Sequence, residues 1–141
     1  MKNIKLLICT FCIIVVSCCS CGLFASERYS CNIEEVESIQ IVSLGGFNKE
    51  ENKYEYTVIS QISDCETFVN RLNDIKYSVN LGEPTVLNPE YTVILINYNN
   101  GDYDLLYSGA QCYYREGRFL TGYVFFNTEQ FNALISDYTT E

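Results

Sequence analysis

Hydrophobic and polar positions alternate in some stretches of this chain and follow a helical period in others. Residues 36–44 and 54–60 carry β-branched and aromatic side chains in partial alternation, which is typical of strands. The short polar loop between them favours an antiparallel pair. Over residues 64–76 the apolar positions recur at helical spacing instead, which predicts a helix with one apolar stripe. Ser63 and Glu66 fit a capping box at its start.

A loop and a second block of strands follow this helix. Residues 77–90 contain a glycine and two prolines, and we expect a strand stub and a long loop there. Residues 91–98 are apolar on both faces, so this strand is expected to lie centrally in the sheet. Asn100-Gly101 predicts a tight hairpin turn to a partner strand at 103–108, because both turn residues accept a positive φ.

A second hairpin and a closing helix complete this block. Strands are expected at 111–114 and 119–126, joined by a three-residue loop over 115–117 with its glycine in the left-handed position. Asn127 is a suitable N-cap for the helix that follows. From Phe131 onward, apolar residues recur at i, i+3, i+4 and i+7, which predicts one buried helix face.

This order of elements predicts an α+β fold. Strands precede a helix in both blocks, and no β-α-β alternation occurs. We therefore expect an antiparallel sheet of about five to seven strands with two helices packed on one face. Residues 33–141 are long enough for a single domain of this kind. The core is expected to join both helices to the central strand, through Phe68, Leu72, Phe131 and Leu134 with Val93 and Leu95.

The amino-terminal segment has a pattern of its own. Lys2 and Lys5 precede an uncharged, strongly apolar run over residues 6–16, which is typical of an export signal. That run has signal-peptide length and falls short of a membrane span. Two alternatives stay open: an uncut anchor over residues 6–26, and ordinary secretory cleavage after Ala25. All three interpretations export the domain that follows.

The end of this leader resembles the lipobox of bacterial lipoproteins. Val15-Val16-Ser17 is followed directly by Cys18, the position at which members of this class carry lipid. The resemblance implies a signal peptide over 1–17, an acyl chain such as palmitate on Cys18, and a flexible tether over 18–32. It places the protein at the extracytoplasmic face of the cell membrane.

The folded part carries a second resemblance. The segment from Tyr91 to Tyr138, with its hairpin at Asn-Gly-Asp and its terminal F-x-x-L-I-x-x-Y helix, is similar to small exported proteins of low-GC Gram-positive bacteria. Those proteins are of unassigned function. This resemblance therefore supports export and implies no activity.

Charge narrows the range of partners. The chain has 18 acidic and 9 basic residues, and two of the lysines lie in the leader, which leaves 7 basic against 18 acidic residues, or −11, in the exported part. Such a surface repels nucleic acid and anionic lipid headgroups. We expect contact with the membrane through the amino-terminal lipid, and no nucleic-acid partner.

The chain lacks histidine and the sequence motifs of common enzyme classes. It contains no histidine, and it has no Gly-rich phosphate loop and no nucleophile elbow. Outside the leader and its junction there remain Cys31, Cys65 and Cys112. Cys65 and Cys112 are interpreted first as small buried residues, and a disulfide between them is the alternative. We expect no metal site and no cofactor.

Carboxylates are the remaining candidates for catalysis. Glu34, Glu35 and Glu37 cluster at the start of the first strand and are interpreted as a solvated strand entrance. Asp102 and Asp104 flank the hairpin at Asn100, where Asn and Asp side chains commonly bond their own backbone. Neither group indicates catalysis, so we assign no catalytic residues and do not expect an enzyme.

Tyrosines are the most distinctive side chains of the folded part. The chain has 12 tyrosines and no tryptophan. If Asn99 pairs with Asp102, then Tyr98, Tyr103 and Tyr107 share one face of the sheet. A face left open by the helices would then carry an aromatic patch suited to binding a protein or a saccharide. The alternative is that the three rings pack in the core.

These patterns favour a non-catalytic, membrane-tethered binding or accessory domain. One alternative is an inhibitor or immunity-type protein whose acidic surface blocks a basic target. A less favoured one is an envelope hydrolase that depends on carboxylates. The identity of the ligand and the oligomeric state do not follow from the sequence.

Overall fold

Eleven elements follow one another along the residues that the computed structural model describes, which are 29–79, 87–121 and 124–139. In chain order they are η2 (Ile33–Glu35), β1 (Val36–Asn48), β2 (Lys53–Gln61), α2 (Cys65–Asn73), β3 (Tyr77–Val79), β4 (Thr92–Tyr98), β5 (Tyr103–Tyr107), β6 (Ala110–Arg115), β7 (Arg118–Thr121), β8 (Val124–Phe126) and α3 (Thr128–Thr139). The leader, Cys18 and the tether up to residue 28 lie outside the described residues.

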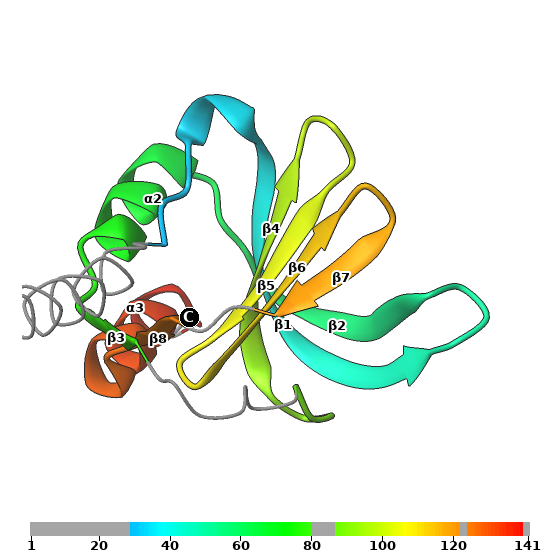
Figure 1. Ribbon diagram of the computed structural model, residues 1–141. Helices are drawn as coiled ribbons and strands as arrows, with labels where there is room; N and C mark the ends of the chain where they lie inside the picture. Colours follow the sequence, from blue (N-terminus) through cyan, green and yellow to red (C-terminus); the bar gives the residue numbers. More distant parts are fainter. Residues whose placement is uncertain (1–28, 80–86, 122–123, 140–141) are drawn as a thin grey trace, which may run out of the picture.

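The main sheet is antiparallel throughout and has six strands in the order β2-β1-β4-β5-β6-β7 (Figure 1). Strand β4 is flanked by β1 and β5, which fits its apolar sequence on both faces. A separate two-stranded ladder joins β3 to β8. The predicted α+β class with an antiparallel sheet is therefore confirmed.

Two hydrophobic clusters lie on the two sides of the main sheet. Figure 1 shows α2 and α3 to the left of this sheet. The buried side chains of both helices join one cluster with Ile94 and Ile96 of β4. Val93 and Leu95 belong to the other cluster. The prediction that the helices meet Val93 and Leu95 is wrong, because alternate residues of a strand point to opposite faces.

Each helix begins at an N-cap residue, and the sequence identified one of the two N-caps correctly. At α2 the Oδ1 atom of Asp64 accepts from the backbone N–H of Thr67 at 3.0 Å, so Asp64 is the N-cap and the predicted Ser63 is not. At α3 the Oδ1 atom of Asn127 accepts from the N–H of Gln130 at 3.0 Å. The prediction for Asn127 is confirmed.

The β4–β5 hairpin has a longer loop than the sequence predicted. Asn97 pairs with Tyr103, and the N–H of Tyr98 donates to the carbonyl of Asp102 at 2.9 Å. Gly101 takes the left-handed conformation at φ 85°. A loop of three residues that ends in a left-handed glycine is a common hairpin connection. The expected pairing of residues 99 and 102 is thus wrong by one position, which moves Tyr98 to the opposite face from Tyr103.

The β6–β7 hairpin, in contrast, has a shorter loop than the sequence predicted. Arg115 pairs with Arg118, so the loop contains only Glu116 and Gly117. Both residues have positive φ, at 49° and 81°, as a type I′ turn requires. The predicted three-residue loop is therefore wrong, and a glutamate occupies a position that favours asparagine, aspartate or glycine.

Candidate functional site

The structure separates the three tyrosines that the sequence placed together. Tyr103 and Tyr107 pack with the cluster on the side of Val93 and Leu95. Tyr98 belongs to the helix-side cluster and is only 8% exposed. The prediction of one patch is therefore wrong for Tyr98, and the shifted register of the β4–β5 hairpin is the reason.

Other tyrosines share the sheet side of Tyr103 and Tyr107. Tyr54 and Tyr91 pack against the same cluster, and Tyr56 pairs across the ladder with Leu44 of that cluster. We call this side of the sheet the aromatic face, and it comprises Tyr54, Tyr56, Tyr91, Tyr103 and Tyr107. Sequence reasoning missed Tyr54 and Tyr56, although their i, i+2 spacing in a strand already placed them on one face.

A groove of about 140 Å³ lies on the aromatic face. Leu95 and Leu105, both buried, supply its apolar floor, while Tyr56 is 48% exposed at its side. Neighbouring rings hold its other tyrosines, since Tyr54 meets Phe47 edge-on at 5.0 Å and Tyr103 stacks on Tyr114 at 4.8 Å. The residues that line this groove are Lys53, Tyr54, Tyr56, Leu95, Asn97, Tyr103 and Leu105.

A larger cavity of about 520 Å³ lies where β2, β4, β5 and α3 come together. Tyr91 and Tyr107 line it, and their rings stack at a centroid distance of 4.4 Å. Its full lining is Ile59, Glu90, Tyr91, Thr92, Tyr107, Asn132, Ile135, Ser136 and Thr139. Tyr107 is the one lining residue that the sequence had indicated as part of a binding surface.

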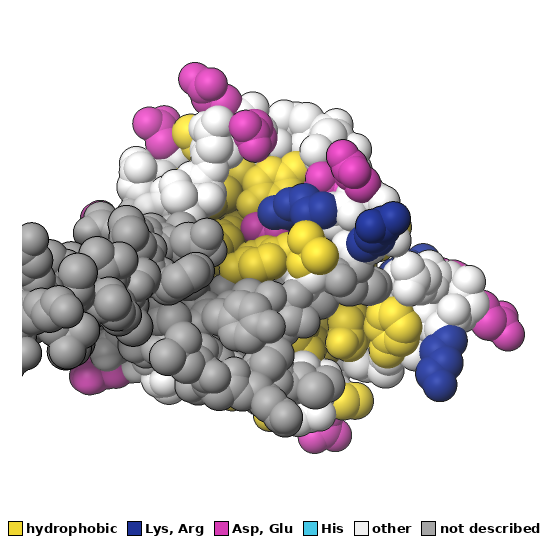
Figure 2. All heavy atoms as spheres, viewed as in Figure 1, with side chains coloured by type: hydrophobic (Ala, Val, Ile, Leu, Met, Phe, Trp, Pro, Cys, Tyr) yellow, Lys and Arg dark blue, Asp and Glu magenta, His cyan; other side chains and the backbone are white. Residues whose placement is uncertain are grey.

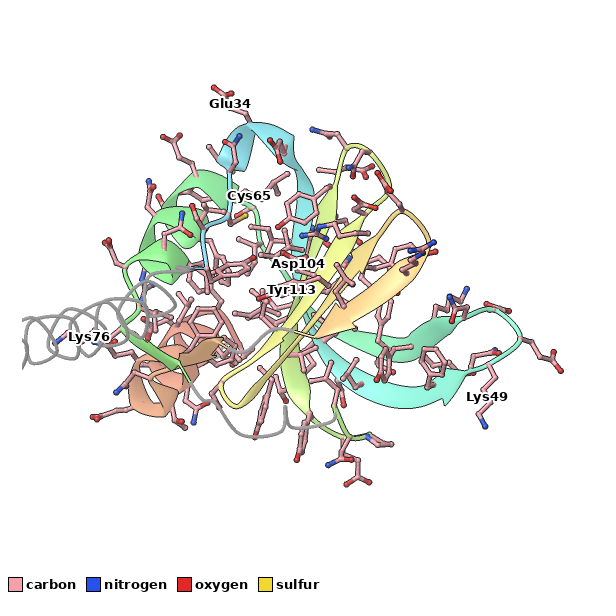
Figure 3. All side chains as sticks on the ribbon, in the orientation of Figure 1. Glu34, Lys49, Cys65, Lys76, Asp104 and Tyr113 are labelled. Carbon is pink, nitrogen blue, oxygen red and sulfur yellow. The ribbon has the colours of Figure 1, made fainter. Side chains whose placement is uncertain are left out.

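On the helix side of the sheet, Asp104 forms the centre of a polar cluster. Its side chain is 1% exposed. The Oδ2 atom accepts hydrogen bonds from the hydroxyls of Tyr98 at 2.6 Å and Tyr29 at 3.0 Å. The Oδ1 atom is paired with Arg115, whose Nη2 lies 2.5 Å from it as an ion pair. Figure 3 labels Asp104 between the sheet and the helices, near Tyr113.

Burial controls the protonation of this cluster. It raises the pKa of the Asp104 carboxyl, and the hydrogen bond from Tyr98 and the charge of Arg115 only partly offset the effect. Burial and the Asp104 charge together raise the pKa of both tyrosine hydroxyls, which therefore stay protonated donors. Asp104 raises the pKa of Arg115 against the opposing effect of burial.

The Asp104 cluster connects four segments of the chain. Arg115 also donates through Nη1 to the carbonyls of Tyr103 at 3.1 Å and Tyr114 at 2.9 Å, and its guanidinium lies 5.0 Å from the centre of the Tyr98 ring. The cluster therefore joins β4, β5 and β6 to the segment that holds Tyr29. Its buried position gives it a structural role, whereas the sequence had interpreted Asp104 as a turn residue.

Asp102 does take part in turns. Its Oδ1 atom accepts from the N–H of Glu116 at 3.0 Å, and its Oδ2 atom accepts from Nδ2 of Asn100 at 2.9 Å. Asp102 thus braces the neighbouring β6–β7 turn as well as its own. Glu34 and Glu35 lie exposed in η2, and Glu37 is exposed on β1. Among the described residues, no group of three or more His, Cys, Asp or Glu side chains is placed to hold a metal ion.

The described cysteines are free thiols. Cys31 is buried, and Cys65 is half-buried with its Sγ atom 3.6 Å from the carbonyl of Ile62. The side chain of Cys112 is outside those that the structure describes. The structure thus gives no support to a disulfide between Cys65 and Cys112.

No helix in the described part of the chain is long and apolar enough to cross a bilayer. The chain matches no family model, and no curated protein or solved structure shows significant similarity to it.

Proposed function

We propose that the protein is a membrane-tethered, extracytoplasmic lipoprotein whose folded part is a non-catalytic binding domain. The observation that carries the proposal is the groove on the aromatic face. It combines a buried leucine floor with tyrosines that have both an apolar ring and a polar hydroxyl. Such amphipathic side chains are enriched where proteins bind partners.

The geometry of the groove suits binding more than chemistry. Its polar side chains are Asn97, Lys53 and the tyrosines, and Lys53 is exposed and ion-paired with Glu51. Tyr54 and Tyr103 are held by contacts with neighbouring rings, so little side-chain freedom is lost when a ligand binds. The ligand is a protein or a saccharide of the envelope, since both are recognised by open aromatic surfaces.

The leader supports the tethered location. Lys2 and Lys5, the apolar run after them and the small residue before Cys18 follow the order of an exported lipoprotein. Labelling intact cells with a radioactive palmitate tests this part of the proposal. Cys18→Ala should abolish the label, while Cys19→Ala, one residue away, should retain it. Equal labelling of both variants would remove Cys18 as the site of the acyl chain.

The groove is tested by crosslinking in intact cells. A photoreactive phenylalanine analogue at position 56, in the full-length chain, should capture a ligand. The same analogue at position 120 is a matched control, because Leu120 has a similar exposure of 51% on β7. Protease or glycosidase sensitivity of the adduct then tells a protein ligand from a saccharide.

A substitution in the groove completes this test. Tyr103→Ala should reduce the adduct at position 56, because it removes one wall of the groove. A melting curve of the variant shows whether the fold is retained. Equal adducts at positions 56 and 120, or no adduct at 56, would contradict the binding proposal and leave the lipid-anchor proposal standing.

A further inference from the structure

The cavity beside α3 has a chemical character different from that of the groove. Its volume of about 520 Å³ lies within the range of small-molecule sites. Tyr91 and Tyr107 form its aromatic wall, with ring planes 15° apart. Nδ2 of Asn88 donates to the hydroxyl of Tyr91 at 3.1 Å, which fixes that ring from outside the lining. The cavity therefore offers a preformed aromatic surface next to polar side chains of α3.

Charge in the cavity has one sign. Glu90 is the acidic residue among the described residues that line it, and no lysine or arginine occurs in that lining. The exported part of the chain, with 18 acidic and 7 basic residues, adds to the negative potential. An anionic ligand would be repelled there, while a cation would find a carboxylate and the open outer face of one ring of the stacked pair.

The backbone holds Glu90 firmly at this position. Its φ is 73°, in the left-handed region that few residues other than glycine adopt. The N–H of Glu90 donates to the carbonyl of Leu44 at 2.8 Å, and the N–H of Leu44 donates to the carbonyl of Tyr91 at 2.9 Å. These two bonds join the Glu90-Tyr91 segment to β1, so the backbone of both lining residues is fixed before any ligand binds.

From this geometry we propose that the cavity is a binding site for an organic cation, either a quaternary ammonium group or a protonated amine. The carboxylate of Glu90 balances the charge, and the outer face of the stacked Tyr91–Tyr107 pair contacts the apolar surface of the cation. A carboxylate combined with aromatic rings is the arrangement by which proteins recognise such ligands. The site is separate from the groove, whose lining shares no residue with it.

Choline is the probe for the first test. Added to the full-length protein in a neutral detergent, it should give saturable shifts in the NMR signals of Tyr91, Tyr107 and Ile135. The neutral isostere 3,3-dimethylbutan-1-ol has the same shape without the charge, and it should bind about tenfold more weakly or worse. A Gly-Lys-Gly peptide in the same titration tells a polypeptide source from a free ammonium ligand: competition with choline assigns the former, and no competition the latter.

Matched variants complete the test. Glu90→Gln should weaken choline binding by about tenfold. Glu116→Gln removes the same charge from another exposed glutamate with positive φ, at 49°, and should leave binding unchanged. Tyr107→Leu removes an aromatic ring and should also weaken binding, which keeps the proposal testable if Glu90→Gln does not fold.

Equal binding of the neutral isostere, equal effects of the two glutamate variants, or no saturable shift with choline would overturn the proposal. Tyr56→Ala should not affect choline binding, so a failure of the groove is distinguishable from a failure of this site.

Discussion

Among the described residues, Asp104 is the one acidic or basic residue that is buried. A carboxylate with 1% exposure is tolerated only when charge and hydrogen-bond partners compensate it. Here two tyrosine hydroxyls and one guanidinium do so, and they come from β4, β6 and the segment before η2. Loss of one partner should therefore disturb several segments together.

Arg115→Met tests how strongly the fold depends on this compensation. The change leaves the Asp104 charge buried without its ion-pair partner, which typically costs about 3 kcal/mol of unfolding free energy. Arg115 is 35% exposed, so solvent screening reduces this and we expect about 2 kcal/mol at neutral pH. Urea denaturation measures it. Arg71→Met is a matched control, because Arg71 also has a 2.5 Å ion pair and a tyrosine ring beside it, but on the surface. It should cost about 1 kcal/mol or less.

The carboxyl of Asp104 also makes the stability of the folded state depend on pH. Its pKa is raised on folding, so the folded state retains the proton over a pH range in which the unfolded chain has lost it. The contribution of Asp104 to stability is therefore fully present below its ordinary pKa of 3.8 and is lost as the pH rises through the folded value. Arg115→Met raises the folded pKa further, so its deficit relative to the wild type should shrink toward acid. A deficit that grows as the pH falls would contradict this assignment.

At the scale of elements, the β6–β7 turn is strained. Glu116 has a φ of 49° at the first position of a two-residue turn, where asparagine is favoured. Glu116→Asn should stabilise the protein by about 0.5–1 kcal/mol, because asparagine adopts this conformation at lower cost. Gly117→Ala, at φ 81°, should destabilise it. Urea denaturation of both variants checks the expected opposite signs, and two changes of the same sign would argue against a type I′ turn.

The two hairpins also show how far the sequence determines this fold. Most strand and helix positions followed from apolar spacing, since burial of one face imposes a period on the residues. The single strand expected over 119–126 is wrong, because β7 and β8 belong to different sheets. The lengths of the two loops did not follow, because Asn-Gly suits both two- and three-residue turns and Glu-Gly indicates neither. A shift of one residue moved Tyr98 into the core and Asp104 beside it, which no local pattern revealed. The groove and the cavity join distant strands and α3, so only part of their lining could be predicted.

The last residues of the expected tether, 29–32, are fastened to α2. The side chain of Asn73, at the end of α2, accepts from the N–H of Cys31 and donates to its carbonyl, both at 3.0 Å. Asn73→Ala removes both bonds, so residues 29–32 should separate from the body more often. Chymotrypsin should then cut after Tyr29 several-fold faster, as intact mass spectrometry would show. Asn70→Ala, an exposed neighbour on α2, is the control. Equal cleavage of the two variants would mean that Tyr29 and the burial of Cys31 suffice to hold the segment.

At the scale of the whole molecule, net charge opposes the compact state. Figure 2 shows acidic side chains spread around the edge of this view and hydrophobic ones gathered toward its centre. With 18 acidic and 7 basic residues in the exported part, like charges repel one another on a small surface. The repulsion acts over about 30 Å at about 10 mM salt and is largely screened at molar salt.

Glu37→Lys, a change at an exposed position of β1 beside η2, should relieve part of this repulsion. Because Glu34 and Glu35 lie near it in sequence, the change replaces one carboxylate of an acidic cluster by an opposite charge. A gain of about 0.3–0.5 kcal/mol corresponds to a rise in Tm of about 2 °C for a domain of this size. Thermal unfolding at about 10 mM salt should show this rise, and about 0.5 M sodium chloride should remove it. A rise that persists at high salt would assign the effect to a local contact of the introduced side chain rather than to the overall charge, because only long-range repulsion is screened away.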